Sequence, residues 1–157
     1  PFLRSKKLSG DKVKDYPVIR NCLKISEKYY KILFDYIVLL RPTSPYREKL
    51  LIEEGLKKLH NDKLSTSLRS VIQTKKHPYR HWKINKKGRM ISIVSHVKEP
   101  YNIPRQQLPK MFFQTGDIEI VKRKTIMNGS ISGTRVIPLI VKSYYDIDTI
   151  DDIKNIR

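Results

Sequence analysis

The chain has 157 residues, 39% of them hydrophobic, which is enough to form the core of one domain. It has 33 lysines and arginines and 15 aspartates and glutamates, which gives a net charge of +18 at pH 7. This charge favours anionic partners such as nucleotides, acidic sugars or nucleic acid. A proteome rich in lysine and isoleucine would produce the same balance without a functional meaning. One cysteine excludes an internal disulfide, four scattered histidines form no zinc pattern, and no apolar run approaches the ~20 residues of a membrane span, so we expect a cytoplasmic protein without a membrane partner.

The first part of the chain predicts a helix and then a strand. Apolar residues at helical spacing predict a helix over 15–33, with Cys22 on its buried face as a small core residue. The aliphatic run at 37–40 predicts a strand over 34–40 that is fully buried, as in the middle of a parallel sheet. The strand should stop before Pro42, because proline has no N–H to give to a sheet ladder.

A polar loop follows this strand and carries two arginines, a threonine and a serine within residues 41–47. We expect Ser44 to cap a second helix over 45–60, with a proline in its first turn. Ligands in open α/β sheets bind at the carboxyl ends of strands, and a helix N-terminus favours anions, so the loop is either an anion site or an ordinary βα turn. A strand over 65–73 would complete a right-handed βαβ unit.

Basic and aromatic residues interleave over 75–84, as they do on platforms for single-stranded nucleic acid. For Trp82 in this stretch, a packed or interfacial aromatic is the interpretation that we favour. The sequence Asn-Lys-Lys-Gly at 85–88 predicts a hairpin turn. A proline-punctuated polar loop follows at 99–109, where Arg105 has the guanidinium that can grip a carboxylate or phosphate through two hydrogen bonds.

Two further strands are predicted near the end of the chain. The strand over 111–123 is interrupted by Gly116, where the backbone can come close to a ligand. The second strand covers 136–141, after a tight loop.

An acidic cluster ends this very basic chain. Asp146 and Asp148 would lie on one side of an extended segment, about 7 Å apart at ~3.3 Å per residue, where they could share a Mg²⁺ ion completed by water and phosphate. A purely structural interpretation also exists, because Thr149 and Asp152 fit a capping box and acids favour the first turn of a helix, here expected over 150–156.

Five segments resemble motifs of the acylneuraminate cytidylyltransferases, the CMP-sialic acid synthetases, in the order of that family. Leu-Leu-Arg-Pro-Thr-Ser-Pro-Tyr-Arg at 39–47 is similar to the family's Leu-Gln-Pro-Thr-Ser-Pro-Leu-Arg, and residues 1–4 resemble its Pro-Phe-x-Arg-Pro segment. Residues 77–84 match His-Pro-Tyr-x-x-x-Lys-Ile, residues 104–109 match Pro-Arg-Gln-x-Leu-Pro, and residues 146–149 match Asp-Ile-Asp-Thr.

The resemblance implies a three-layer α/β/α, Rossmann-like nucleotide-diphospho-sugar transferase fold (GT-A-like) with a mixed sheet. Residues 1–157 would be one cytidylyltransferase domain, its C-terminal part, with an arm at about 75–104 for dimerisation and for covering the sugar acid. The implied reaction joins CTP to a nonulosonic acid and yields the CMP-sugar and pyrophosphate, for cell-surface glycan or lipopolysaccharide synthesis. A homodimer and Mg²⁺ are the implied assembly and cofactor.

The resemblance also implies roles for individual residues. Asp146 and Asp148 would be the catalytic pair that holds the metal. The nucleotide would be bound by Arg4, Arg41, Pro42, Thr43 and Ser44. The sugar would be bound by Lys83, Arg105, Gln106 and Gly116. No residue is a convincing general base.

The chain also departs from the family's pattern. Arg41 stands where the family usually has glutamine, and Thr-Gly-Asp-Ile-Glu at 115–119 replaces Asn-Gly-Ala-Ile-Tyr, so the identity of the sugar stays open. The family's first strand and its Gly/Arg/Lys-rich loop for CTP have no counterpart in this sequence. We therefore expect a partly exposed apolar edge, poor solubility and no activity for this chain alone.

Two alternatives to an active enzyme stay open. One is a basic nucleic-acid-binding module, suggested by the net charge and by residues 75–87, although we regard nucleic acid as the less favoured partner. The other is an inactive member or fragment of the family, which keeps the fold without the chemistry.

Overall fold

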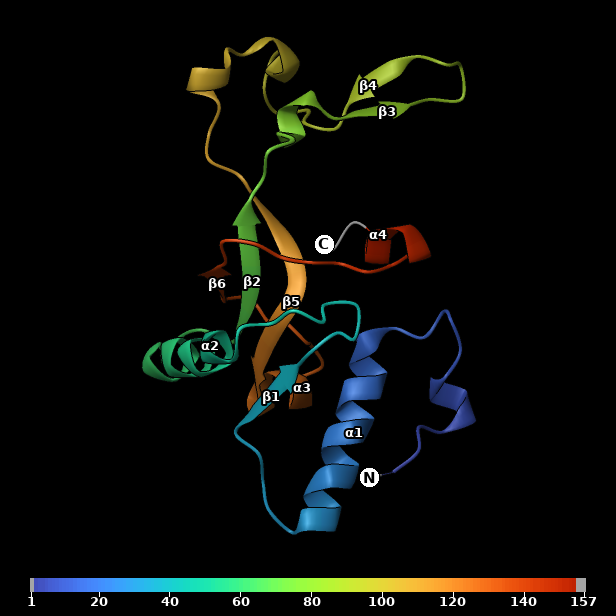
Figure 1. Ribbon diagram of the computed structural model, residues 1–157, viewed down its shortest axis with the longest axis vertical. Coiled ribbons are helices and arrows are strands. Elements are labelled where there is room, and N and C mark those ends of the chain that lie inside the picture. Colours follow the sequence, from blue (N-terminus) through green and yellow to red (C-terminus); the bar gives the residue numbers. More distant parts are fainter. Residues whose placement is uncertain (1, 155–157) are drawn as a thin grey trace.

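A computed structural model describes residues 2–154, except for the side chain of Lys49. A four-stranded mixed sheet carries helices, and a separate two-stranded hairpin lies in an arm beyond it (Figure 1). The elements in chain order are α1 (Asp15–Tyr30), β1 (Tyr36–Leu39), α2 (Lys49–Asn61), β2 (Ser67–Gln73), β3 (Trp82–Ile84), β4 (Met90–Ser92), β5 (Phe112–Lys122), α3 (Arg123–Met127), β6 (Val136–Ile140) and α4 (Ile150–Lys154). The expected α/β class with a mixed sheet is confirmed.

The strand order is β1-β5-β2-β6, with β5 antiparallel to both of its neighbours and β2 parallel to β6. Ile120 on β5 faces Val38 on one side and Leu68 on the other. Since β1 and β2 both run against β5, they run parallel to each other, and β5 is inserted between the strands of the predicted βαβ unit.

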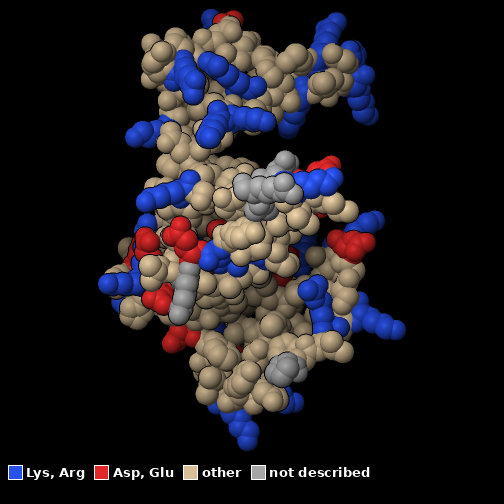
Figure 2. Space-filling view, in the orientation of Figure 1, with Lys and Arg blue, Asp and Glu red and all other residues tan. Residues whose placement is uncertain are grey.

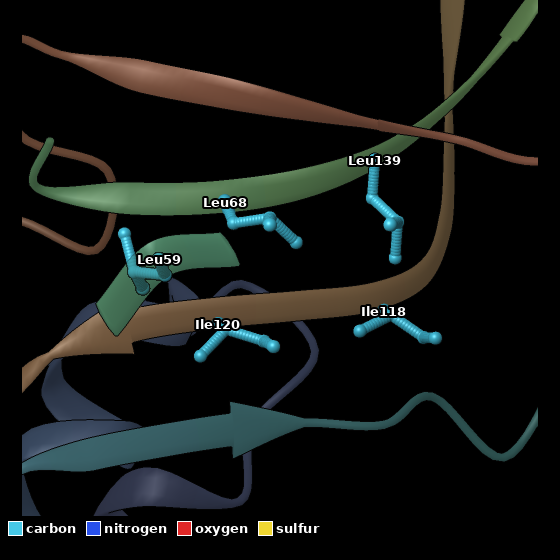
Figure 3. Packing of buried hydrophobic residues seen from close by; sticks show 5 residues of the cluster. All are labelled: Leu59, Leu68, Ile118, Ile120 and Leu139. Carbon is cyan, nitrogen blue, oxygen red and sulfur yellow. The ribbon is translucent and has the colours of Figure 1, made fainter. Parts of the chain in front are cut away.

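The helices cover both faces of the sheet because the strands alternate their apolar side chains. On the α2 face, Leu59 packs with four strand residues that are almost fully buried, Leu68, Ile118, Ile120 and Leu139 (Figure 3). On the opposite face, Val121 of β5 packs with Ile19 and Leu23 of α1 and with Ile126 of α3. The layers agree with the expected three-layer arrangement, while the finer fold assignment stays a prediction.

The arm comprises residues 74–111 between β2 and β5 and extends past the end of the sheet (Figure 1). The turn predicted at 85–88 is confirmed, because Gly88 N–H donates to Asn85 O (3.0 Å) with a φ of +72° at the glycine. Trp82 packs on Tyr101 with ring centroids 4.3 Å apart, which agrees with its interpretation as a packed aromatic.

The position of β1 differs from the sequence prediction. It is an edge strand whose four residues are half-buried, and β5, its partner, is antiparallel. A run of aliphatic residues does not distinguish a half-buried edge strand from a central one, because both need apolar side chains on each face. Among the described residues no strand pairs with the outer edge of β1, so the predicted exposed apolar edge is confirmed.

The prediction for Cys22 was wrong, because its side chain is exposed. It lines a shallow apolar groove of about 330 Å³ between α1 and the open edge of β1, together with Val18, Ile37 and other apolar residues. No described segment covers this part of α1, which explains why a residue on its apolar face reaches solvent.

The second helix also begins later than predicted. α2 starts at Lys49, and neither Ser44 nor the N-cap residue Glu48 gives it a side-chain cap. Ser44 is instead buried in the preceding loop, where its N–H donates to Arg41 O (3.2 Å). Within residues 2–154, no helix combines the length and the apolar character that crossing a bilayer requires.

Candidate functional site

Two loops that are far apart in the sequence meet beyond the carboxyl ends of β1 and β6. Ile147 N–H donates to Thr43 O (2.8 Å), which joins the Pro42–Ser44 loop to the segment that carries Asp146 and Asp148. The rings of Tyr46 and Tyr145 lie 5.4 Å apart and add a second contact between the same loops. We call this meeting point the loop junction.

The acidic segment divides into structural and free carboxylates. Asp152 Oδ2 accepts from Thr149 N–H (2.7 Å), and Thr149 Oγ1 accepts from Asp152 N–H (3.3 Å), so the predicted capping box is confirmed. The pKa of Asp152 is held below its ordinary value, and the hydrogen bond from the Thr149 hydroxyl makes the largest contribution. Asp146 and Asp148 are exposed, and within residues 2–154 their carboxylates have no ion pair.

A magnesium ion would therefore find two free carboxylates at the loop junction. Within the described part of the chain, no cluster of three or more histidine, cysteine or acidic side chains could hold a metal. Two carboxylates completed by water and phosphate are nevertheless a usual magnesium site, so Asp146 and Asp148 fit the predicted ion.

Arg41 lies in a network of charges at this loop. Its Nη2 donates to Asp15 Oδ2 (2.9 Å) and to Glu119 Oε1 (3.0 Å). Glu119, which is almost completely buried, also accepts from Arg69. Burial opposes the charge on Arg41, but the hydrogen bonds to both carboxylates hold its pKa above the ordinary value. The predicted nucleotide-binding arginine therefore already has two carboxylate partners.

Arg47 fixes the loop to the irregular part of β5. Its Nε donates to Asp117 O (2.9 Å) and its Nη2 to Arg41 O (3.0 Å). The same Nε lies 3.3 Å from Asp117 Oδ1, but that oxygen accepts no hydrogen bond because the N–H is directed at the backbone carbonyl. Burial raises the pKa of Asp117, and Arg47 offsets only part of this effect.

Gly116 lies beside this network, in the bulge where β5 loses its register with β2. Its φ is +74°, and a Cβ there would lie 3.4 Å from Arg41 Cδ. The side chain that comes close to Gly116 is that of Arg41, and an approach of this backbone to a ligand stays a prediction.

One of the predicted sugar-binding residues of the arm, Arg105, lines a cationic pocket. Arg105 lines this pocket of about 390 Å³ with Lys75, Lys76, His77, Arg80, His81 and Leu108. The arm has ten lysines and arginines and one acid, Glu99, and Figure 2 shows basic side chains over much of its surface. Gln106 is exposed next to Arg105, whereas Lys83 lies on β3 and does not line the pocket.

The structure thus brings the predicted residues together in two groups. The loop junction is surrounded by the first group: Arg41, Pro42, Thr43, Ser44, Gly116, Asp146 and Asp148. The second group belongs to the arm beyond the sheet and consists of Lys83, Arg105 and Gln106 (Figure 1). Arg4 is exposed and precedes α1.

Sequence reasoning missed four of the residues that hold the loop in place: Asp15, Arg69, Asp117 and Glu119. It considered Arg47 only as part of a possible anion site, not as a structural contact. One signal was present. The chain departs from the family's pattern at both Arg41 and Glu119, and these two residues form an ion pair. When two positions both differ from the family's pattern and carry residues of opposite charge, a contact between them is a reasonable prediction.

Comparison with known proteins shows a distant relative. No family model matches the chain. It is 26% identical over 159 residues to the post-translational flagellin modification protein B of Campylobacter coli. The match covers 98% of this chain, which spans 64% of the length of that relative. The chain is therefore similar to a protein of flagellin modification.

Proposed function

We propose that this chain carries the carboxyl-terminal part of a cytidylyltransferase that activates a nonulosonic, sialic-acid-like sugar. The reaction would join CTP and the sugar acid into the CMP-sugar and release pyrophosphate. The observation that carries the proposal is the hydrogen bond between Thr43 O and Ile147 N–H, because it unites the two motifs that the reaction needs. The similarity to a flagellin modification protein supports a role in surface glycan synthesis, and the nucleotide substrate favours a cytoplasmic location.

At the loop junction, Asp146 and Asp148 would hold Mg²⁺, which would stabilise the negative charge on the phosphates when it is bound. Pro42 and Thr43 lie alongside the nucleotide, the buried Ser44 supports their loop from inside, and Arg4 adds a positive charge. A phosphate that binds Arg41 has to replace Asp15 or Glu119 as its partner. Asp15 is the easier one to replace, because it is half-exposed whereas Glu119 is buried.

In the arm, Arg105 grips the carboxylate of the sugar acid, with Gln106 and Lys83 beside it. A pocket lined by lysines, arginines and histidines without an acid suits such an anion. The arm lies beyond the sheet, whereas the loop junction lies at the end of the sheet itself. We therefore propose a homodimer in which the arm of one chain covers the loop junction of the other. The anomeric hydroxyl then attacks the α-phosphate, close to the bulge at Gly116.

The test is pyrophosphate release from CTP with Mg²⁺ and a panel of nonulosonic acids, using the complete reading frame that contains these residues. The variant Asp146→Asn with Asp148→Asn should lose at least about a hundredfold in rate, or about 2.7 kcal/mol. Asp11→Asn with Glu54→Gln removes the same charge at exposed positions and should keep the rate. Absence of release with every acid, or an unchanged rate in the first variant, would refute the proposal.

The charge of the arm supports nucleic-acid binding as a second candidate function. Ten basic residues against one acid in 74–111 form a surface of a single sign. Binding of a single-stranded oligonucleotide would then weaken steeply with salt, with a slope of roughly 0.7 per phosphate contact. This binding would be indifferent to Mg²⁺ and to Asp146→Asn, which separates it from the enzyme.

A further inference from the structure

A second pocket, of about 430 Å³, lies at the opposite end of the sheet from the loop junction. It is built where β2 begins and β5 ends, with α3 and the loop before β6 as its other walls. The loop junction instead follows the carboxyl ends of β1 and β6, and the two places share no residue.

Three lysines line this pocket, Lys63, Lys122 and Lys124, and no acidic residue does. Lys122 Nζ donates to the carbonyl oxygens of Asp62 (2.8 Å) and Lys63 (3.3 Å), which holds its charge at the wall. Within residues 2–154, Lys63 and Lys124 take part in no ion pair. Three like charges, offset only by Asp62 near Lys122, create a positive potential that an anion would relieve.

The acid nearest in sequence, Asp62, does not line the pocket, although its carboxylate lies close enough to Lys122 to interact with that charge. The carboxylate of Asp62 accepts from the hydroxyl of Ser65 (2.6 Å) and from its N–H (3.1 Å). The hydrogen bond from the Ser65 hydroxyl is the largest effect that holds the pKa of Asp62 below its ordinary value, and the charge of Lys122 adds to it. Asp62 therefore offsets part of the charge of Lys122 but lies outside the pocket.

The loop before β6 adds neutral donors. Ser130 Oγ accepts from the N–H groups of Ser132 (3.1 Å) and Gly133 (2.8 Å), so its hydroxyl proton is left to donate to a ligand. Thr134 also lines the pocket. The loop is held firmly, because Gly133 has a φ of +67° and a Cβ there would lie 2.5 Å from Thr66 Oγ1.

From this arrangement we propose that the pocket binds an oxyanion of the phosphate class, either free phosphate or the phosphate group of a small molecule. Lysine ammonium groups and hydroxyls donate hydrogen bonds to the oxygens of such an ion, and charge-assisted bonds of this kind are the strong ones. The site is independent of the proposed reaction, since it shares no residue with the loop junction or with the cationic pocket of the arm.

The test is a titration of the chain with inorganic phosphate at constant ionic strength, followed through its amide ¹H–¹⁵N spectrum. Saturable shifts are expected at residues 63–66 and 124–134. Lys63→Gln with Lys124→Gln should weaken phosphate at least about tenfold, or about 1.4 kcal/mol. Lys24→Gln with Lys28→Gln removes two exposed lysines of α1 and should leave the affinity unchanged.

Two results would overturn the site. One is equal affinity in the two double variants, and the other is a set of shifts confined to the arm, which would assign phosphate to the arm pocket instead. The substituted side chains are exposed, so both variants should keep the melting temperature of the unchanged chain, and this is checked before the titration.

Discussion

Glu119 is a charged residue between two fully buried isoleucines of β5, and it is tolerated there because two arginines neutralise it. Glu119→Gln keeps the shape but removes the charge, leaving Arg41 and Arg69 to repel each other. We expect the free energy of unfolding to fall by about 2–3 kcal/mol, somewhat below the loss for a fully buried pair because Arg41 is 39% exposed.

Asp15 is the matched control for this prediction, because it binds the same nitrogen of Arg41 but is 46% exposed. Asp15→Asn should cost about 0.5 kcal/mol in chemical denaturation. Equal losses in the two variants would contradict the view that Glu119 anchors the network.

Glu27 and Arg123 connect α1 to the start of α3 through two hydrogen bonds, 2.6 Å and 3.1 Å long. The hydrogen bond from Arg123 is the largest effect on Glu27 and lowers its pKa from the ordinary 4.5. A carboxylate with a lowered pKa stabilises the fold above pH 4.5, and this contribution is lost as the pH falls further. Glu27→Gln should therefore melt lower than the unchanged chain at pH 7, and the two melting temperatures should converge toward pH 3.

The contact between α2 and the sheet depends on Gly55. A Cβ at this position would lie 2.8 Å from Ile120 Cδ1, so the helix approaches the strand more closely than a side chain allows. Gly55→Ala should lose about 1 kcal/mol, because overpacking exceeds the gain in helix propensity. Ile120→Val removes the atom that clashes. The loss of unfolding free energy in the double variant should therefore be about 1 kcal/mol smaller than the sum of the losses in the two single variants.

Denaturation of the four proteins of this cycle measures the coupling. Gly10→Ala serves as the control, because the nearest atom to its new Cβ is Val13 Cγ2 at 3.8 Å. If the losses of unfolding free energy in the two single variants add up to the loss in the double variant, the clash with Ile120 Cδ1 does not destabilise the protein.

Local patterns were sufficient for elements whose signals are short-range. The helix at α1, the strands β2, β5 and β6, the turn at 85–88 and the capping box of Thr149 with Asp152 all appear where expected. Pairing between strands depends on distant parts of the chain, so the insertion of β5 beside β1 was not predictable from either segment. Ser44 and its proline resemble a helix start, but Arg47 turns inward to Asp117 and keeps the loop extended to Glu48.

For the candidate site, the resemblance assigned the Pro-Thr-Ser-Pro loop to the nucleotide and the acidic segment to the metal, but no local pattern predicted that the two segments meet. The hydrogen bond from Ile147 to Thr43 supports that meeting, whereas the carboxylate partners of Arg41 come from α1 and β5 and left no local pattern. Ligand roles for all of these residues stay predictions.

Over the whole molecule, the open edge of β1 and its apolar groove favour self-association. Unpaired edge strands aggregate readily, and a charge beside the edge is a common protection. Cys22→Lys places such a charge on the groove wall and should lower light scattering of the concentrated chain severalfold. Cys22→Ser is the control without charge, and equal scattering of the two variants would show that aggregation arises elsewhere.

The exposed thiol of Cys22 also offers a practical opportunity. It is the single cysteine of the chain and lies on the wall of the groove, so a maleimide dye would attach at one known place without any mutation. An environment-sensitive dye there would shift its emission to the blue whenever an apolar segment or a second copy covered the groove. The chain therefore contains its own optical reporter for the state of its open edge.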